Sequence, residues 1–386
     1  MKKVGFTLLI LLVFGGVFYY SGGKDSESTD GITESVRLSE TKTNTKNVDS
    51  IDIVDSVAVV SPCSFIFEPT QDEGPYYTGK LLDAHLHLPS ASIAVSKVST
   101  QLGLPTPAWN NTLTVDYFRC LLQQEATDSV YGFHLLTKYS VTSEVDKAKA
   151  IEKKYPGMVK HFVMPSFISD AIDPDIASVR EALEDNPGLF VGMGELKMYD
   201  GKSPDDPQVL AFLDLAREFK LLVMMHPFNH HKGAVEKIVK DYSDVTFLLH
   251  SVGYDDSRGE NRTYNNLDWL DTLITNNANV YYSIDGGLPF SGWLKEHDTI
   301  AVPKEVSLPH AKLVFTDILN REVGLYKALI EKHPDRFLRG TDRWYGPHFD
   351  SEVSALMDEF SRAFIGRLDA GVQERFAYLN AKKLLK

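Results

Sequence analysis

Short apolar runs alternate with longer amphipathic segments over most of this chain. The apolar runs have the length of strands and cover residues 80–87, 130–135, 159–166, 189–197, 221–226, 245–250, 280–284 and 337–342. Apolar residues recur at helical spacing in the segments "PQVLAFLDLAREFK", "GAVEKIVKDY", "DWLDTLITNN" and "REVGLYKALIEKH", which lie between these runs. Helix-length segments between apolar strands are typical of βαβ units and predict a parallel sheet.

Eight strand candidates favour an α/β fold, the closed (β/α)8 TIM barrel. Such a barrel needs ~250 residues, so a chain of 386 residues can hold one with extra loops. The alternative is an open doubly wound sheet. That fold usually carries a glycine-rich phosphate loop after its first strand, and the sequence has no such loop.

The N-terminus has the pattern of an export signal. The basic "MKK" precedes an apolar run from Val4 to Tyr20, which also has a length suited to a membrane span. A cleaved signal peptide and an uncleaved membrane anchor over residues 1–21 both stay open, and in either case the rest of the chain is exported to the periplasm or the cell exterior. Residues 22–50 are rich in Ser, Thr and charged residues, which predicts a flexible linker before a barrel domain at residues 51–386.

Charge and cysteine content exclude some classes of partner and site. The formal net charge of -13 argues against general affinity for nucleic acid or anionic membranes, so we expect membrane contact only through the N-terminal segment. Two cysteines, Cys63 and Cys120, are too few for a disulfide framework and do not form a CxxC zinc pair. One disulfide or two inert thiols both stay open.

The first strand candidate, "LLDAHLHLP", carries polar residues at alternate positions. Asp83, His85 and His87 share one face of this strand, because successive side chains of a strand point to opposite faces. A strand that only packs would have Val or Ile there. Taken alone, the two histidines fit a ligand role and a structural role equally well.

Four further ionisable residues stand at the C-terminal ends of apolar runs. Glu195 ends the fourth run, His226 the fifth, His250 the sixth and Asp342 the eighth. In a barrel these ends converge on one face, where active sites lie. The predicted ligand set is His85, His87, Glu195, His226, His250 and Asp342. Nitrogen and oxygen ligands of this kind suit zinc, and also manganese, iron or cobalt.

Each residue taken singly has a structural interpretation. Glu195 could pair with Lys197, and Asp342 could cap a helix. A lone histidine at a strand end is more often a hydrogen-bonded structural residue than a ligand, and we interpret His134, His161 and His333 in this way. The common phase of the other six with the barrel strands favours the metal site.

The order of these residues resembles the amidohydrolase superfamily of metal-dependent hydrolases. The resemblance runs from about residue 80 to the C-terminus, where "FAYLNAKKLL" is similar to the Asn-Ala helix of TatD-like and amidohydrolase-related members. Too few residues flank the strands for the β-sandwich domain of urease-like members, so a stand-alone barrel is expected. At the fourth strand the chain has "GEL". It is similar to the "GE" of TatD-like and phosphotriesterase-homology members, whereas other branches have a carbamylated lysine.

The resemblance implies a binuclear metal site. His85, His87 and Asp342 would hold the inner ion, His226 and His250 the outer one, and Glu195 would bridge them. If Glu195 points away, the site holds one ion. Metal binding lowers the pKa of water to ~7, and Asp342 would act as the catalytic base that takes its proton.

The expected reaction is hydrolysis of an amide, ester, lactone or phosphoester bond in a small, anionic substrate. Two alternatives stay open: a mononuclear, decarboxylase-like lyase of the same superfamily, and a non-catalytic binding barrel. We expect the βα loops to contact this small molecule. The predicted contacts are Lys197, Tyr254, Arg258 and Arg343, with Lys138, Tyr199, Asn229, His230, Asp285, Trp344 and Tyr345 as further candidates.

Overall fold

A computed structural model describes residues 63–65, 67–90, 113–167, 172–197, 202–251, 266–285, 304–344 and 346–385. Its centre is one sheet of eight strands in the order β1 to β8, each parallel to the next. The strands are β1 (Leu81–His87), β2 (Thr127–Leu136), β3 (Val159–Pro165), β4 (Phe190–Lys197), β5 (Leu222–His226), β6 (Phe247–Leu249), β7 (Val280–Asp285) and β8 (Phe337–Gly340). The predicted (β/α)8 barrel is confirmed.

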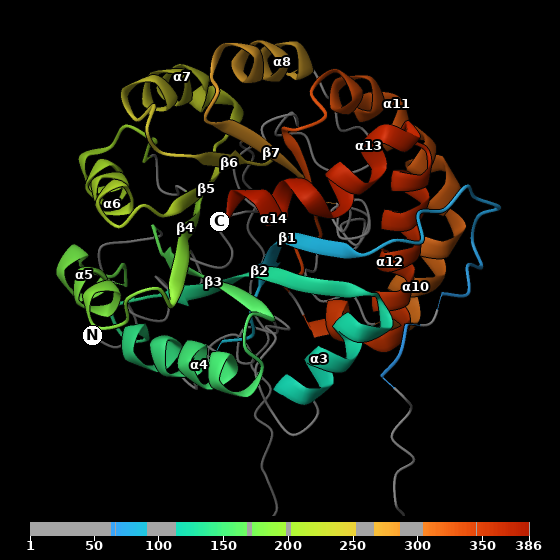
Figure 1. Ribbon diagram of the computed structural model, residues 1–386, viewed down its shortest axis with the longest axis horizontal. Helices are drawn as coiled ribbons and strands as arrows, with labels where there is room; N and C mark the ends of the chain where they lie inside the picture. Colours follow the sequence, from blue (N-terminus) through green and yellow to red (C-terminus); the bar gives the residue numbers. More distant parts are fainter. Residues whose placement is uncertain are drawn as a thin grey trace, which may run out of the picture. The chain divides into compact units, whose positions relative to one another are not determined.

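Backbone hydrogen bonds between β1 and the residues after β8 close the ring. The amide of His87 donates to the carbonyl of Arg343 at 2.8 Å, and the amide of Asp342 donates to the carbonyl of His85 at 2.9 Å. Figure 1 shows the strands as a central ring with the helices arranged around it.

Helices follow the strands and cover the outside of the ring. They are α3 (Val115–Gln124), α4 (Val141–Lys154), α5 (Ile176–Glu184), α6 (Pro207–Glu218), α7 (Lys232–Asp241), α8 (Leu267–Asn276), α10 (Lys304–Leu313), α11 (Phe315–Lys332), α12 (Ser351–Gly366), α13 (Ala370–Glu374) and α14 (Asn380–Leu384), with short η1 (Asn229–His231), η3 (Gly346–Phe349) and η4 (Arg375–Leu379). Local sequence starts them: Asp206 accepts from the amide of Gln208 at 2.9 Å, and Pro207 begins α6.

The end of the chain covers the N-terminal ends of the strands. The Asn380 amide group donates to the carbonyls of Pro334 at 2.8 Å and Phe337 at 2.9 Å, and the Tyr131 hydroxyl donates to the carbonyl of Ala381 at 2.5 Å. In Figure 1, α14 lies across the ring of strands. The Asn-Ala segment therefore closes one mouth of the barrel, and a site can open at the other.

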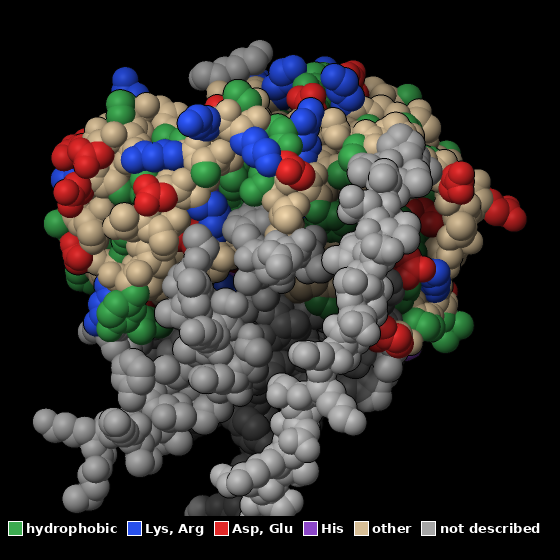
Figure 2. Space-filling view, turned by 90° about the horizontal axis from the view of Figure 1, so that it is seen from below, with side chains coloured by type: hydrophobic (Ala, Val, Ile, Leu, Met, Phe, Trp, Pro, Cys, Tyr) green, Lys and Arg blue, Asp and Glu red, His purple; other side chains and the backbone are tan. Residues whose placement is uncertain are grey.

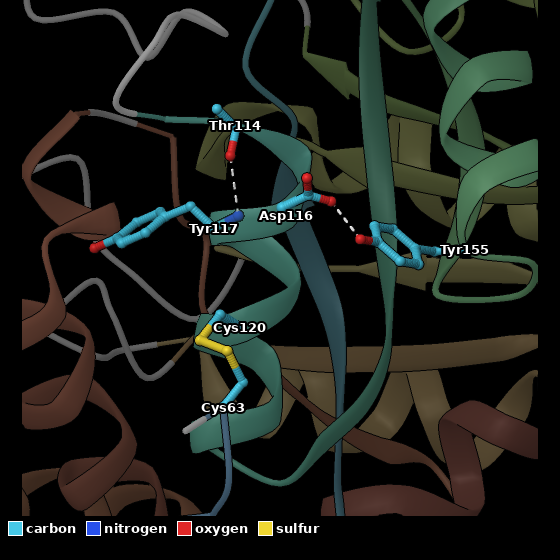
Figure 3. Close-up of a disulfide and its surroundings, with 6 residues drawn as sticks. All are labelled: Cys63, Thr114, Asp116, Tyr117, Cys120 and Tyr155. Atoms are coloured by element: carbon cyan, nitrogen blue, oxygen red, sulfur yellow. Dashed lines mark hydrogen bonds between the residues drawn. A yellow bond between two sulfur atoms is a disulfide. The ribbon is translucent and has the colours of Figure 1, made fainter. Parts of the chain in front are cut away.

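The segment before β1 is held to two outer helices. Cys63 forms a disulfide with Cys120 of α3, which decides between the two states that the sequence left open (Figure 3). The amide of Gln71 donates to Glu359 of α12 at 2.7 Å. The chain thus enters the compact unit Cys63–Lys386 through an anchored segment.

The predicted signal or anchor (residues 1–21) and linker (residues 22–50) lie outside the described residues. Within the described part of the chain, no helix has both the length and the apolar character needed to cross a membrane. On the face seen in Figure 2, Lys and Arg side chains are interspersed with Asp and Glu over the part that is described.

Candidate metal centre

The C-terminal ends of five strands bring the six predicted ligands together. His85 and His87 lie on β1, Glu195 on β4 and His226 at the end of β5. His250 directly follows β6, and Asp342 lies two residues beyond β8. Two groups of these side chains have ligand atoms within 4.8 Å of one another: His85, His87 and Asp342, and His85, Glu195 and His250.

The first group surrounds one point from three sides. The Nε2 atoms of His85 and His87 lie 3.3 Å apart. The Asp342 Oδ1 atom is 3.4 Å from Nε2 of His85 and 3.2 Å from Nε2 of His87. This set matches the inner ligands that the resemblance implies.

Glu195 belongs to the second group and also reaches His87 of the first. Its Oε2 atom is 3.3 Å from Nε2 of His87, and its Oε1 atom is 2.5 Å from Nε2 of His250. The Nδ1 atom of His226 also contacts Oε1. His226 is outside both three-residue groups, so its predicted ligand role rests on this contact with Glu195.

Local backbone features aim these side chains. Asp342 has φ +48°, in the left-handed region that non-glycine residues seldom adopt, and such residues cluster at functional sites. Asp83 fixes the position of Thr341, the residue before Asp342, because the Oδ1 atom of Asp83 accepts from the amide of Thr341 at 3.0 Å. At Gly340 a Cβ atom would lie 2.9 Å from Cβ of His85, so the lack of a side chain leaves room for the cluster.

Carboxylates hold two of the imidazoles in their charged form. Burial alone would lower the pKa of His87, but hydrogen bonds to Asp342 and Glu195 raise it to about 9. Burial also opposes the charge on His250, and the charges of Glu195 and Asp285 raise its pKa to about 10. The protons on these two rings occupy positions that a metal cation would take. Metal binding to the rings would therefore release protons.

The pKa of His226 shifts in the opposite direction. Burial, and then the charges of Lys197 and His250, lower its pKa to about 3, so this ring is neutral and offers a lone pair. Burial raises the pKa of Glu195, but the charges and hydrogen bonds of His250 and His226 hold it well below the usual range. Neutral imidazole and ionised carboxylate are the forms that bind metals.

Three of the six predicted ligands keep some exposure to solvent. The side chains of His85 and His250 are fully buried, whereas those of His87, His226 and Asp342 are 18%, 14% and 13% exposed. Buried carboxylates and imidazoles are costly unless they are paired or hold an ion. The residues present therefore fit a divalent metal ion.

Asp285, predicted as a substrate contact, has a different position. Its Oδ1 atom is 3.0 Å from Nδ1 of His85 and its Oδ2 atom is 2.8 Å from Nδ1 of His250. Its side chain is almost fully buried behind these rings, so we correct the substrate assignment. The signal was available in the sequence, because Asp285 directly follows the seventh apolar run, at the same end of its strand as the predicted ligands.

The prediction that Arg343 contacts the substrate is also corrected. Its side chain is fully buried, and its guanidinium donates to Glu125 at 2.8 Å and to Ser354 at 3.0 Å. A buried guanidinium that is bound to an internal carboxylate cannot reach a substrate.

Lys197 is partly buried in register with His226, and its charge lowers the pKa of that ring. Lys138 and His230 are exposed, and Trp344 is partly buried. Asn229 begins η1. The other predicted contacts, Tyr199, Tyr254, Arg258 and Tyr345, lie outside the described residues.

The three histidines interpreted as structural lie apart from the two ligand groups. His134 Nε2 and His161 Nδ1 are 2.8 Å apart in a buried contact between β2 and β3. His333 Nε2 lies 2.6 Å from Oδ1 of Asp271, at the end of α11. Their positions agree with that interpretation.

No protein-family model and no curated protein matches this sequence. Solved structures do match its fold. An amidohydrolase of Burkholderia multivorans with bound zinc superposes with a TM-score of 0.53 at 12% identity, over 80% of this chain and 99% of that chain. A probable 2-pyrone-4,6-dicarboxylic acid hydrolase of Acinetobacter baumannii with citric acid bound gives 0.51 at 15% identity, over 80% and 99%. The structural neighbours are thus barrels of the amidohydrolase superfamily, and the chain shares their fold.

Proposed function

We propose that this chain is a metal-dependent hydrolase of the amidohydrolase superfamily. The observation that carries the proposal is the convergence of four imidazoles and two carboxylates from five strands at one mouth of the barrel. The zinc bound to the structural neighbour from Burkholderia multivorans supports the same assignment. Zinc is the favoured ion, and manganese, iron or cobalt would accept the same ligands.

In this proposal His85, His87 and Asp342 hold one ion, His226 and His250 hold a second, and Glu195 bridges them. A divalent ion in such a site lowers the pKa of bound water to ~7, which supplies a nucleophile at neutral pH. The Asp342 carboxylate accepts the proton of the attacking water and returns it to the leaving group. Asp342 suits this role because 13% of its side chain is exposed.

The substrate in this proposal is a small anion with an amide, ester, lactone or phosphoester bond. Lys197 supports an anionic substrate, because it is a cation beside His226 near the mouth of the site. The structural neighbour from Acinetobacter baumannii has citric acid bound, which is a small carboxylate anion.

Elemental analysis tests the metal site. Protein purified under metal-replete conditions is expected to contain close to two divalent transition-metal ions per chain. Replacement of both His85 and His87 by alanine should remove at least one ion and should abolish the rise in thermal midpoint that zinc gives wild-type protein, because a ligand stabilises the state that binds it. His333→Ala is the matched control, since that histidine pairs with Asp271 and should leave metal content unchanged.

The metal count also separates the alternatives. One ion per chain, together with products that contain no added water, would favour the mononuclear lyase. Fewer than half an ion per chain would contradict the metal-dependent enzyme and favour a binding barrel.

We further propose that the barrel is exported. The basic and apolar start of the sequence supports this, and so does the Cys63–Cys120 disulfide, since disulfides persist in oxidising compartments. Protease added outside intact cells or spheroplasts is expected to digest the barrel, and mass spectrometry without reductant should find the two cysteines joined. A barrel that is fully protected until the cells are lysed, with free thiols, would contradict export.

A further inference from the structure

One carboxylate behind the metal centre contacts a histidine from each of the two ligand groups. Asp285 ends β7, and its side chain is 1% exposed. Its Oδ1 atom lies 3.0 Å from Nδ1 of His85 and its Oδ2 atom lies 2.8 Å from Nδ1 of His250. An ionised carboxylate only accepts hydrogen bonds, so each Nδ1 atom carries the hydrogen.

This arrangement leaves the other nitrogen of each ring for the centre. Nε2 of His85 lies 3.4 Å from Asp342, and Nε2 of His250 lies 2.5 Å from Glu195. An imidazole with its hydrogen on Nδ1 binds a metal through the lone pair on Nε2. A carboxylate that holds a ligating histidine in this way raises its basicity and fixes its orientation.

The surroundings keep Asp285 in place. The Ser283 hydroxyl donates to its Oδ1 atom at 3.1 Å. A Cβ atom at position 340 would lie 2.7 Å from the same Oδ1, so glycine there allows the close approach of β8. A buried carboxylate is costly without partners, and the partners of Asp285 are these two imidazoles and one hydroxyl.

We propose that Asp285 is a positioning residue that orients both His85 and His250 for metal binding through Nε2. The inference rests on the proposed function, because it assigns a role toward ions bound at that site. One carboxylate here contacts two ligand rings, those of His85 and His250.

The test is the isosteric variant Asp285→Asn. Its amide keeps one acceptor oxygen and replaces the other by an NH2 donor, so only one of the two rings can still donate from Nδ1. The other ring must move its hydrogen to Nε2, which removes the lone pair that a metal needs. We expect zinc affinity, measured by competition with a chromophoric chelator, to fall about 10- to 100-fold for at least one ion. The visible absorption of the cobalt-substituted protein should change as well.

Ser283→Ala is the matched control. It removes one hydrogen bond to Asp285 and keeps the carboxylate, so its zinc affinity should stay within about threefold of wild type, well below the change expected when the carboxylate itself is lost. Near-UV circular dichroism of the metal-free variants checks that the barrel is folded. If Asp285→Asn does not fold, NMR of the zinc-loaded wild-type protein with 15N-labelled histidine gives the answer, since both rings must show a hydrogen on Nδ1.

The outcomes separate this inference from the proposed function. Wild-type zinc affinity and an unchanged cobalt spectrum in Asp285→Asn would overturn the positioning role and leave the metal enzyme intact. A ring without a hydrogen on Nδ1 in the zinc-loaded wild type would also overturn it. A wild-type protein that binds no zinc or cobalt would overturn both.

Discussion

Replacing Arg343 with alanine is expected to lower the free energy of unfolding by about 3–5 kcal/mol, because it leaves a buried carboxylate without its partner. The guanidinium of Arg343 donates to Glu125 at 2.8 Å, and the exposed fractions of the two side chains are 1% and 6%. Urea denaturation of the variant and the wild type measures the change.

Two further variants control this prediction. The double variant Arg343→Met with Glu125→Leu should recover most of the lost stability, since replacing both members of a buried pair by apolar residues is close to neutral. Arg180→Ala removes an ion pair with Glu218 whose members are 39% and 53% exposed, and it should lower the free energy of unfolding far less than Arg343→Ala does. A stable Arg343→Ala protein with a raised KM would instead show that Arg343 binds the substrate.

The hydrophobic pattern predicted all eight strands, because parallel strands are buried on both faces and read as continuous apolar runs. It was less accurate at their ends. The predicted eighth strand includes Asp342, whereas β8 ends at Gly340. The reason is that φ of Asp342 is +48°, which breaks the extended conformation, and sequence alone does not report that angle.

The prediction that Arg343 contacts the substrate rested on its place directly after the eighth apolar run, where a βα loop was expected to begin. The partner of Arg343, Glu125, lies 218 residues earlier in the chain, and no local pattern connects the two. A long-range pair of this kind becomes visible only when the fold brings the segment after β8 and the end of α3 together.

Asp285 shows the reverse case. Asp285 directly follows the seventh apolar run, at the same end of its strand as Glu195, His226 and His250. Periodicity could therefore place it among the inward-facing residues. Periodicity gives the direction of a side chain but not its depth. The structure adds that Asp285 lies behind His85 and His250, where it contacts Nδ1 of each ring.

Replacing Asp342 with asparagine is expected to lower the hydrolytic rate by a factor of about 10²–10⁴, the usual contribution of general acid–base catalysis. Asparagine keeps the shape and one oxygen ligand, but it cannot accept a proton from water. The Oδ1 atom of Asp342 lies 3.2 Å from Nε2 of His87. Metal content, measured by elemental analysis, should fall only modestly, and the rate should be measured on esters, lactones, amides and phosphoesters that carry an anionic group.

Glu195→Gln is the matched variant for this test. Glu195 contacts His226 and His250 through one oxygen and lies 3.3 Å from His87 through the other, so as a bridge it would offset charge on two ions. Its neutral amide should therefore weaken metal binding more than Asp342→Asn does. Near-normal turnover in Asp342→Asn with its metal retained would show that another group takes the proton. Loss of metal in Asp342→Asn as complete as in Glu195→Gln would mean that its carboxylate serves mainly as a ligand.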